Sequence, residues 1–309
     1  MKLLKPSLPS FSVSARRKTA AADSSRATTW GLVGALVGAF LALLLNLPAP
    51  WLAQGLSEIS KGQLQLQEAQ GSVWNGSGKL VLTGGAGSRD ALALPGRILW
   101  NLNVSFNTSR WPAFHLNVQA SCCMAQAVRI QLTPANTFQT WRLQADDHRS
   151  EWPAQWLSGL GAPWNTLQPE GTLVLETKQL VLHYASNQTQ LQGSLHLTAQ
   201  DLSSKLSTLK PMGTYVLSLA NANSANDASA KDTSAKNTSA NTTSANASPQ
   251  LTLRTQSGSL LLSGQGHWQG TQFQFRGEAS AVPEHAAALS NLLNIIGRRQ
   301  GARSLLSLG

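Results

Sequence analysis

The residue types that carry most enzyme chemistry are present in this chain, but their spacing matches no known catalytic or metal-binding motif. Asp146-Asp147-His148 would supply an acid–base group, yet it lies in a polar turn. Gly264 to Gly270 resembles a dinucleotide-binding loop, but its spacing is wrong and no helix follows, so it indicates a hairpin bend. The histidines are scattered, at positions 115, 148, 183, 196, 267 and 285. We expect no catalytic residue, no metal ligand and no cofactor.

The only two cysteines, Cys122 and Cys123, are adjacent. Consecutive Cα atoms lie about 3.8 Å apart, below the usual disulfide range of about 4.4–6.8 Å, so a bond between them would be strained. No spaced second pair is present to complete a zinc site. We interpret them as small residues near a strand or turn. An intermolecular disulfide or a redox-active vicinal pair is the alternative.

The elements that would position any site begin with an uncharged run of eighteen residues, Trp30 to Leu47. Six Lys or Arg and one acidic residue precede this run, and such a basic flank favours a cytoplasmic N-terminus. A run of this length is about 27 Å long as a helix. We therefore predict a cytoplasmic tail over 1–29, a transmembrane helix over 30–47 and a periplasmic domain over 48–309.

A cleaved signal peptide is the alternative interpretation of this region. Its lead of 29 residues is long for one, and the apolar run exceeds the usual hydrophobic core of a signal. The stretch Pro48 to Leu52 is also a poor cleavage site. We therefore favour a retained anchor. The exported part is only mildly basic and has no basic run with interleaved aromatic residues, which argues against nucleic-acid binding.

Alternation of apolar and polar residues dominates the chain after the apolar run. Ile98, Trp100, Leu102, Val104 and Phe106 alternate with polar residues and predict a half-buried strand. About a dozen such segments follow one another with short connections, which leave no room for crossover helices. We therefore predict a mainly β fold, with a twisted and mostly antiparallel sheet.

Two helices and one low-complexity loop interrupt this pattern. Trp152 to Leu160 predicts a short helix, and an apolar i, i+3, i+4, i+7 stripe predicts a C-terminal helix over 283–296. Gly297 would stop that helix, and Arg298-Arg299 would complement its dipole. A Ser-Ala repeat over 221–249 has no large apolar residue to bury, so we predict a disordered loop there.

A glycine- and tryptophan-rich signature follows the apolar run. The segment Leu66 to Gly78 reads LQEAQGSVWNGSG and contains Gly71, Val73, Trp74, Gly76 and Gly78. The glycines would permit tight strand bends, with Trp74 as an anchor in the core. Three further stretches accompany this signature: Ile98 to Asn101 with Trp100, Gly161 to Leu175, and Leu289 to Gly301 with Gly297, Arg298 and Arg299.

Together these stretches resemble protein N of the bacterial type II secretion system, also called general secretion pathway protein N. The resemblance covers nearly the whole chain from about residue 30; the long basic lead and the Ser-Ala repeat depart from it. It implies a non-enzymatic inner-membrane subunit that assists the export of folded proteins. Its implied partners are other subunits in the periplasm, in the inner-membrane platform or the secretin.

A second hypothesis is a lipid-binding or lipid-transfer groove protein with phospholipid as its ligand. The family is distantly similar to AsmA-like proteins, whose curved β-sheets form lipid grooves. Tryptophans that would either fill the core or line an apolar trough are found at positions 74, 100, 141, 152, 156 and 268. Of these two interpretations we favour core packing.

Overall fold

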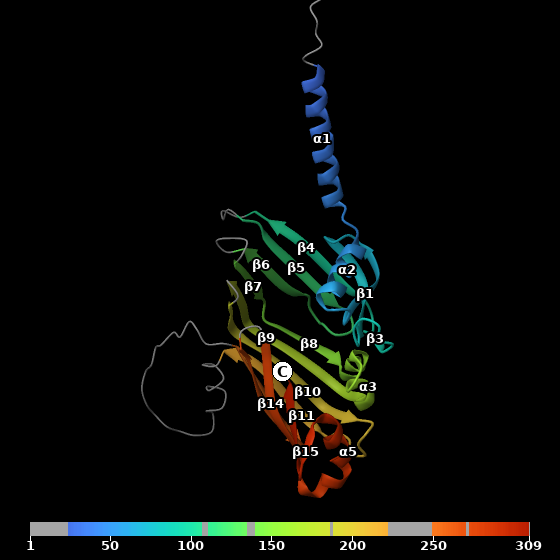
Figure 1. Ribbon diagram of the computed structural model, residues 1–309, viewed down its shortest axis with the longest axis vertical. Helices are drawn as coiled ribbons and strands as arrows, with labels where there is room; N and C mark the ends of the chain where they lie inside the picture. Colours follow the sequence, from blue (N-terminus) through green and yellow to red (C-terminus); the bar gives the residue numbers. More distant parts are fainter. Residues whose placement is uncertain are drawn as a thin grey trace, which may run out of the picture. The chain divides into compact units, whose positions relative to one another are not determined.

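The computed structural model describes residues 24–106, 111–134, 140–185, 188–221, 249–269 and 272–308. The chain divides into two units, Met1–Asn46 and Leu47–Gly309. The first contains α1 (Ser24–Leu45), and the second contains a single large sheet with its covering helices (Figure 1). Most of the predicted loop at 221–249 lies outside the described residues.

The predicted transmembrane helix over 30–47 needs correction. A helix does form there, but it ends at Leu45, so only part of the apolar run is helical. Among the residues that the structure describes, no helix has the length and apolar character needed to cross a membrane. At the end of this helix the Asn46 side chain donates a hydrogen bond to the Ala42 carbonyl oxygen at 2.8 Å, and Pro48 follows.

Within the described residues, the second unit is built on a sheet of sixteen strands that pair antiparallel throughout, where a mostly antiparallel sheet was predicted. Its strands run in the order β1-β2-β4-β5-β6-β7-β9-β10-β11-β12-β13-β14-β16-β15, and β3 and β8 pair with β2 and β9. The strand bounds are β1 (Leu64–Gly71), β2 (Asn75–Thr83), β3 (Ala91–Ala93), β4 (Ile98–Ser105), β5 (Ala113–Ala120), β6 (Val128–Pro134), β7 (Thr140–Ala145), β8 (His148–Pro153), β9 (Pro169–Ala185), β10 (Gln188–Ser204), β11 (Gly213–Asn221), β12 (Pro249–Gly258), β13 (Leu260–Gln269), β14 (Gln272–Ala281), β15 (Arg298–Gln300) and β16 (Arg303–Leu308).

Cross-strand register gives the sheet one apolar face and one polar face. Residues paired directly across antiparallel strands share a face. An apolar row crosses five strands from β4 to β9 through Val104, Phe114, Leu132, Leu143 and Leu182. A polar row crosses four of these strands on the other face, through Asn103, His115, Gln131 and Gln144. The period-two pattern in the sequence therefore corresponds to the two faces of one sheet.

One end of the apolar face is covered by the C-terminal helix, which forms as predicted. The 3₁₀ turn η2 (Pro283–His285) leads into α5 (Ala286–Ile296). Leu289, Leu292 and Leu293 of α5 are buried against the sheet with Tyr215 and Leu260, among others. Burial raises the pKa of the Tyr215 phenol well above its usual value. This cluster is the main hydrophobic core.

Shorter helical segments differ from the sequence prediction. The predicted helix at 152–160 starts later, as the 3₁₀ helix η1 (Ala154–Leu160), because Trp152 and Pro153 pair with β9 as the end of β8. A short α3 (Trp164–Leu167) follows it. The helix α2 (Ala49–Ile59), which the periodicity analysis did not predict, lies against β1. Pro50 fits its first turn, where no amide hydrogen bond is lost.

The predicted hairpin, which joins strands around Trp268 and Phe273, is confirmed by the pairing of β13 with β14. Gly264 and Gly266 are inside β13, and Trp268 pairs with Phe273 across the β13–β14 hairpin. A Cβ on Gly266 would lie 2.6 Å from the Phe273 ring, and one on Gly264 would collide with the Phe275 ring. These glycines therefore make room for aromatic rings that cross the strand, and not for a bend.

Candidate functional site at the signature hairpin

The signature segment forms the hairpin at one edge of the sheet. Its first strand, β1, is eight residues long and pairs with β2 alone among the described strands. At the opposite edge, β15 has only three residues and covers half of β16. Helix α2 lies against β1, and the Ser60 hydroxyl bonds to the N–H and C=O of Leu64 at its start. The main-chain groups of an edge strand that no second strand pairs can bond to an added strand, and β1 is the longer of the two edges.

A β-bulge interrupts this edge strand. The register shifts between Gln67 and Gln70, so that β1 has one residue more than the stretch of β2 that it faces. Glu68, in the bulge, has a φ of 51°, a left-handed conformation that is uncommon for residues with a side chain. A bulge of this kind re-aims side chains and bends the strand locally. Here it turns Glu68 toward residues of two neighbouring segments.

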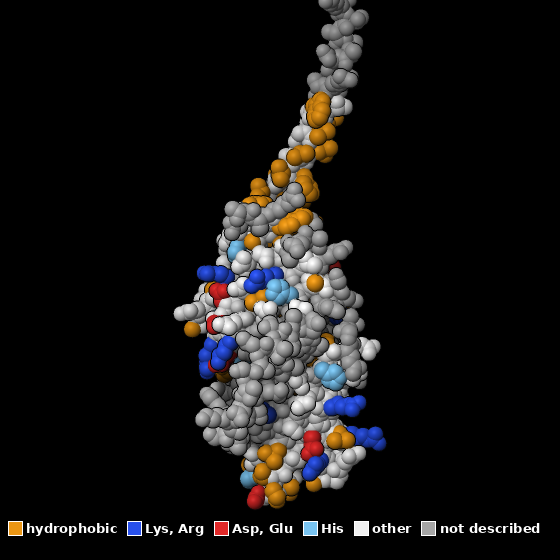
Figure 2. Space-filling model, turned by 90° about the vertical axis from the view of Figure 1, so that its left-hand side faces the viewer, with side chains coloured by type: hydrophobic (Ala, Val, Ile, Leu, Met, Phe, Trp, Pro, Cys, Tyr) orange, Lys and Arg blue, Asp and Glu red, His pale blue; other side chains and the backbone are white. Residues whose placement is uncertain are grey.

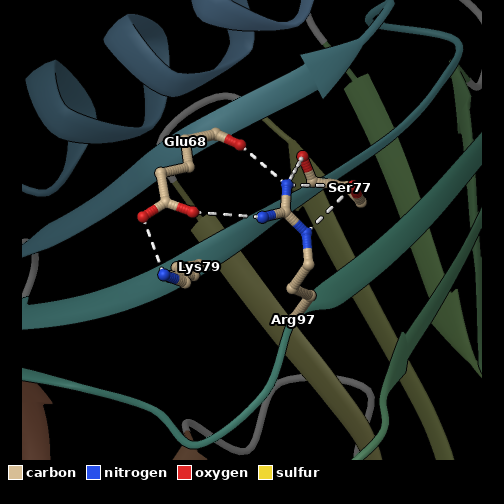
Figure 3. Close-up of polar contacts among 4 residues, drawn as sticks. All are labelled: Glu68, Ser77, Lys79 and Arg97. Carbon is tan, nitrogen blue, oxygen red and sulfur yellow. Dashed lines mark hydrogen bonds and ion pairs between the residues drawn. The ribbon is translucent and has the colours of Figure 1, made fainter.

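Glu68 is the centre of a polar cluster with Ser77, Lys79 and Arg97 (Figure 3). Its carboxylate accepts hydrogen bonds from Lys79 Nζ at 2.7 Å and from Arg97 Nη1 at 3.3 Å. Arg97 Nη2 also donates to the Glu68 carbonyl oxygen at 2.7 Å and to Ser77 Oγ at 3.1 Å. The guanidinium thereby joins β1 and β2 to the segment that leads into β4. The cluster fixes the shape of the bulged edge.

The cluster is open to solvent, which limits its effect on stability. The side chains of Glu68, Lys79 and Arg97 are 55%, 44% and 31% exposed. The hydrogen bond from Lys79 lowers the pKa of the Glu68 carboxyl below its usual value, and the charges of Lys79 and Arg97 act in the same direction. Exposed ion pairs contribute little to folding. We therefore expect this cluster to contribute little to the stability of the fold.

The lowered pKa of the Glu68 carboxyl can be tested by titration. Carboxyl-carbon NMR titration should place the pKa of Glu68 below its usual 4.5. Lys79→Met should raise that pKa more than Arg97→Met, because the Lys79 hydrogen bond is the larger cause. Since the folded pKa is depressed, any stabilisation from Glu68 is present above pH 4.5 and is lost as pH falls through the folded pKa. Equal shifts in both variants would contradict this assignment.

The signature glycines lie where a side chain would disturb the hairpin. Gly71 has a φ of +88°, and a Cβ there would lie 2.5 Å from the Asn75 carbonyl oxygen. A Cβ on Gly76 would collide with the Trp100 ring, and one on Gly78 would lie 2.7 Å from the Leu66 side chain. Trp100 is only 5% exposed and donates from Nε1 to the Ser72 carbonyl oxygen at 3.1 Å.

The remaining predicted signature residues are distributed over two places. Val73 and Trp74 are half-buried in the turn between β1 and β2. The tryptophan that is buried against this hairpin is Trp100 of β4. Gly297, Arg298 and Arg299 lie at the opposite sheet edge. The sheet order therefore separates the C-terminal residues from the hairpin by more than ten strands.

The helix α5 ends at Ile296 with Gly297 as its C-cap, as predicted, but the conformation of Gly297 is not the left-handed one of a typical glycine stop. Gly297 has an extended backbone with a φ of −165°, and a Cβ there would lie 2.5 Å from the Leu305 carbonyl oxygen. Close approach to β16 therefore explains this glycine. Arg298 and Arg299 belong to β15 and not to the last helical turn. Arg299 Nη1 still donates to a carbonyl oxygen of the helix, that of Ser290, at 3.3 Å.

Two of the scattered histidines and Asp147 make structural hydrogen bonds, whereas the buried Nε2 of His148 has no hydrogen-bond partner among the described residues. His115 and His196 hydrogen-bond to Ser105 and Ser218 across neighbouring strands, at 2.8 and 2.9 Å. Burial lowers the pKa of His196. The Asp147 carboxylate accepts a hydrogen bond from the Gln179 backbone N–H at 2.5 Å, beside the bulge in β9. Within the described residues, no group of three His, Cys, Asp or Glu side chains could hold a metal ion.

No pattern in the sequence indicated the Glu68 cluster. Arg97 is 29 residues from Glu68, and no local pattern connects them. The one available signal was Glu68 itself, where a Glu interrupts the alternation of Leu64 and Leu66 with glutamines. A break in alternation at the end of a strand is typical of a bulge.

Comparison with known families agrees with the resemblance in the signature segments. The model of the type II secretion system protein N family matches residues 62–236 and 225–305. The chain belongs to this family. No curated protein and no solved structure matches the chain. The match includes every signature residue of the β1–β2 hairpin, together with Trp100 and the Gly297-Arg298-Arg299 segment. Proteins of this family are components of the type II secretion system, and membership connects this chain with type II secretion.

Proposed function

We propose that this chain is a non-enzymatic subunit of type II secretion that assists assembly or operation of the apparatus by docking another subunit on the β1 edge. The partner is a protein of the inner-membrane platform or the secretin. Membership of the type II secretion system protein N family supports a role in type II secretion. The observation that supports the docking mode is the eight-residue edge strand β1, whose Gln67, Glu68 and Gln70 side chains are exposed.

The chemistry of this edge suits recognition by an added strand. Main-chain groups of an edge strand supply affinity without depending on side chains, and the flanking side chains supply specificity. The Glu68–Arg97–Lys79 cluster places both signs of charge beside the bulge. The bulge also limits unspecific pairing, since it disrupts the regular ladder that an aggregating strand needs. The β1 edge can therefore bind one partner strand specifically, because its side chains and its bulge disfavour other strands.

We further propose that the protein acts at the bacterial inner membrane, with residues 48–309 in the periplasm. The support is the basic N-terminal segment and the apolar side chains around α1, such as Leu36 at 70% and Phe40 at 61% exposed (Figure 2). Such side chains need an apolar surrounding. An alkaline phosphatase fused after Gly309 should be active in cells. An inactive phosphatase on a folded fusion would overturn this location.

Photocrosslinking in secreting cells tests the docking edge. Benzoylphenylalanine placed at Gln67 or Gln70 of β1 should give an adduct with a secretion subunit, identified by mass spectrometry. Gln265 is the matched control, because it is an exposed glutamine on β13, which has strand partners on both sides. Adducts from Gln265 alone, or from none of the three positions in cells that secrete normally, would refute docking at β1.

A lipid-binding groove is the second candidate, and the apolar sheet face favours it. The apolar row from Val104 to Leu182 is half-buried, whereas α5 contacts the sheet at β14, β15 and β16. A half-buried apolar face can hold acyl chains. Phospholipid should then co-purify with the full chain, and Leu132→Glu should remove it. Gln131→Glu, on the polar face, is the control. Absence of lipid from the folded wild-type protein would exclude this candidate.

A further inference from the structure

The turn between β5 and β6 contains a disulfide between the adjacent residues Cys122 and Cys123. The prediction of two unbonded small residues was wrong, because the turn at 121–123 brings the two sulfurs together. A disulfide stabilises a fold mainly by closing a loop in the unfolded chain, and the effect grows with loop length. A bond between neighbours closes the smallest loop, so conformational stability does not explain it.

The position of the disulfide couples it to a distant strand. The Cys123 carbonyl oxygen accepts the backbone N–H of Glu151, in β8, at 2.8 Å. The Cys123 side chain is 6% exposed and belongs to a small core cluster with Leu94 and Ala120, against which Trp152 and Trp156 pack. The turn therefore holds β8 and η1 against the end of β5. A change in the turn is transmitted to β8 through this hydrogen bond and this packing.

The disulfide is also accessible from one side. Cys122 is exposed, and both cysteines line an open depression of about 570 Å³ together with residues 147–151 of the β7–β8 region. Arg149 at this site is paired with Glu151 at 3.2 Å and Glu176 at 2.6 Å. Thiol exchange requires an attacking thiolate to reach one sulfur. The depression provides that access at Cys122, whereas Cys123 is covered by the core cluster.

We propose that Cys122–Cys123 is a thiol–disulfide exchange site for an external dithiol protein or small dithiol. One thiolate of the dithiol attacks Cys122 Sγ, the Cys122–Cys123 bond breaks, and Cys123 leaves as a thiolate that takes up a proton. The second thiol of the dithiol, as its thiolate, then attacks the mixed disulfide and releases Cys122. The Cys122 thiolate also takes up a proton, so the protein gains two protons and two electrons, and the dithiol, which loses them, becomes a disulfide. Reduction releases the turn and loosens its contact with β8.

Native reduction of the full-length protein tests this proposal. Thiols are trapped with an alkylating reagent at cell lysis, and the oxidised protein is then treated with dithiothreitol without denaturant. Intact mass should rise by two hydrogen atoms, and reoxidation should reverse the change. Hydrogen exchange at the Glu151 amide should become faster in the reduced form. Two free thiols at lysis, or an oxidised pair that is reduced only after unfolding, would overturn the proposal.

Single-cysteine variants test the direction of attack. In Cys123→Ser the exposed Cys122 thiol should react with a maleimide at least about tenfold faster than the Cys123 thiol of Cys122→Ser, because a buried thiol reacts only after local opening. Circular dichroism shows whether each variant is folded. If one variant does not fold, glutathione treatment of the wild-type protein replaces it, and peptide mapping should find the adduct on Cys122. Equal rates, or an adduct mainly on Cys123, would contradict the assigned order of steps.

Discussion

Replacing Trp100 with alanine should lower the free energy of unfolding by about 3–5 kcal/mol, the range for large aromatic side chains in cores. The indole is 5% exposed and lies against Gly76, and its Nε1 donates to the Ser72 carbonyl oxygen at 3.1 Å. The substitution removes this packing and leaves the carbonyl oxygen without its donor. Urea unfolding followed by far-ultraviolet circular dichroism measures the change.

Trp51→Ala is the matched control for this experiment. Trp51 is 63% exposed on α2, so its removal should change the free energy of unfolding by less than about 0.5 kcal/mol. If both variants lose the same stability, the signature hairpin does not depend on Trp100. The result would also bear on the proposed function, because the docking edge β1 is held in place by this hairpin.

The second large effect is expected at the C-terminal helix. Leu293→Ala should lower the free energy of unfolding by about 2–5 kcal/mol, since the substitution leaves a cavity in the main core. Leu293 is 1% exposed and belongs to the cluster that α5 forms with Tyr215 and Leu260. Denaturant unfolding, with the slope checked against the wild type, reports this loss.

Ile295→Ala on the same helix provides the comparison. Ile295 is 41% exposed, and alanine is the better helix former, so we expect a change below about 1 kcal/mol. A loss at Ile295 as large as that at Leu293 would mean that α5 buries a different face. The two substitutions shorten similar side chains two residues apart, and therefore separate packing from helix propensity.

Much of the fold was predictable from local patterns. Alternation from Ile98 onward predicted β4, and the stripe through Leu289, Leu292 and Leu293 predicted α5. These signals are reliable because a strand or helix with one buried face must repeat apolar residues at its own period. The short connections likewise predicted the antiparallel pairing. Family membership was also predictable, since it rests on contiguous segments such as Gly71 to Gly78.

The candidate site itself depended on contacts between distant residues. Glu68 and Arg97 meet because a bulge turns Glu68 while β2 and β4 pair side by side, and neither event leaves a periodic signal. The role of Gly297 likewise depends on its close contact with β16. The burial of Trp100 depends on its ring packing against Gly76, which has no side chain. Periodicity reports which face of an element is buried, whereas register and packing decide which residues meet. The edge position of β1 and the link from Cys123 to Glu151 in β8 therefore followed from the order of strands in the folded sheet.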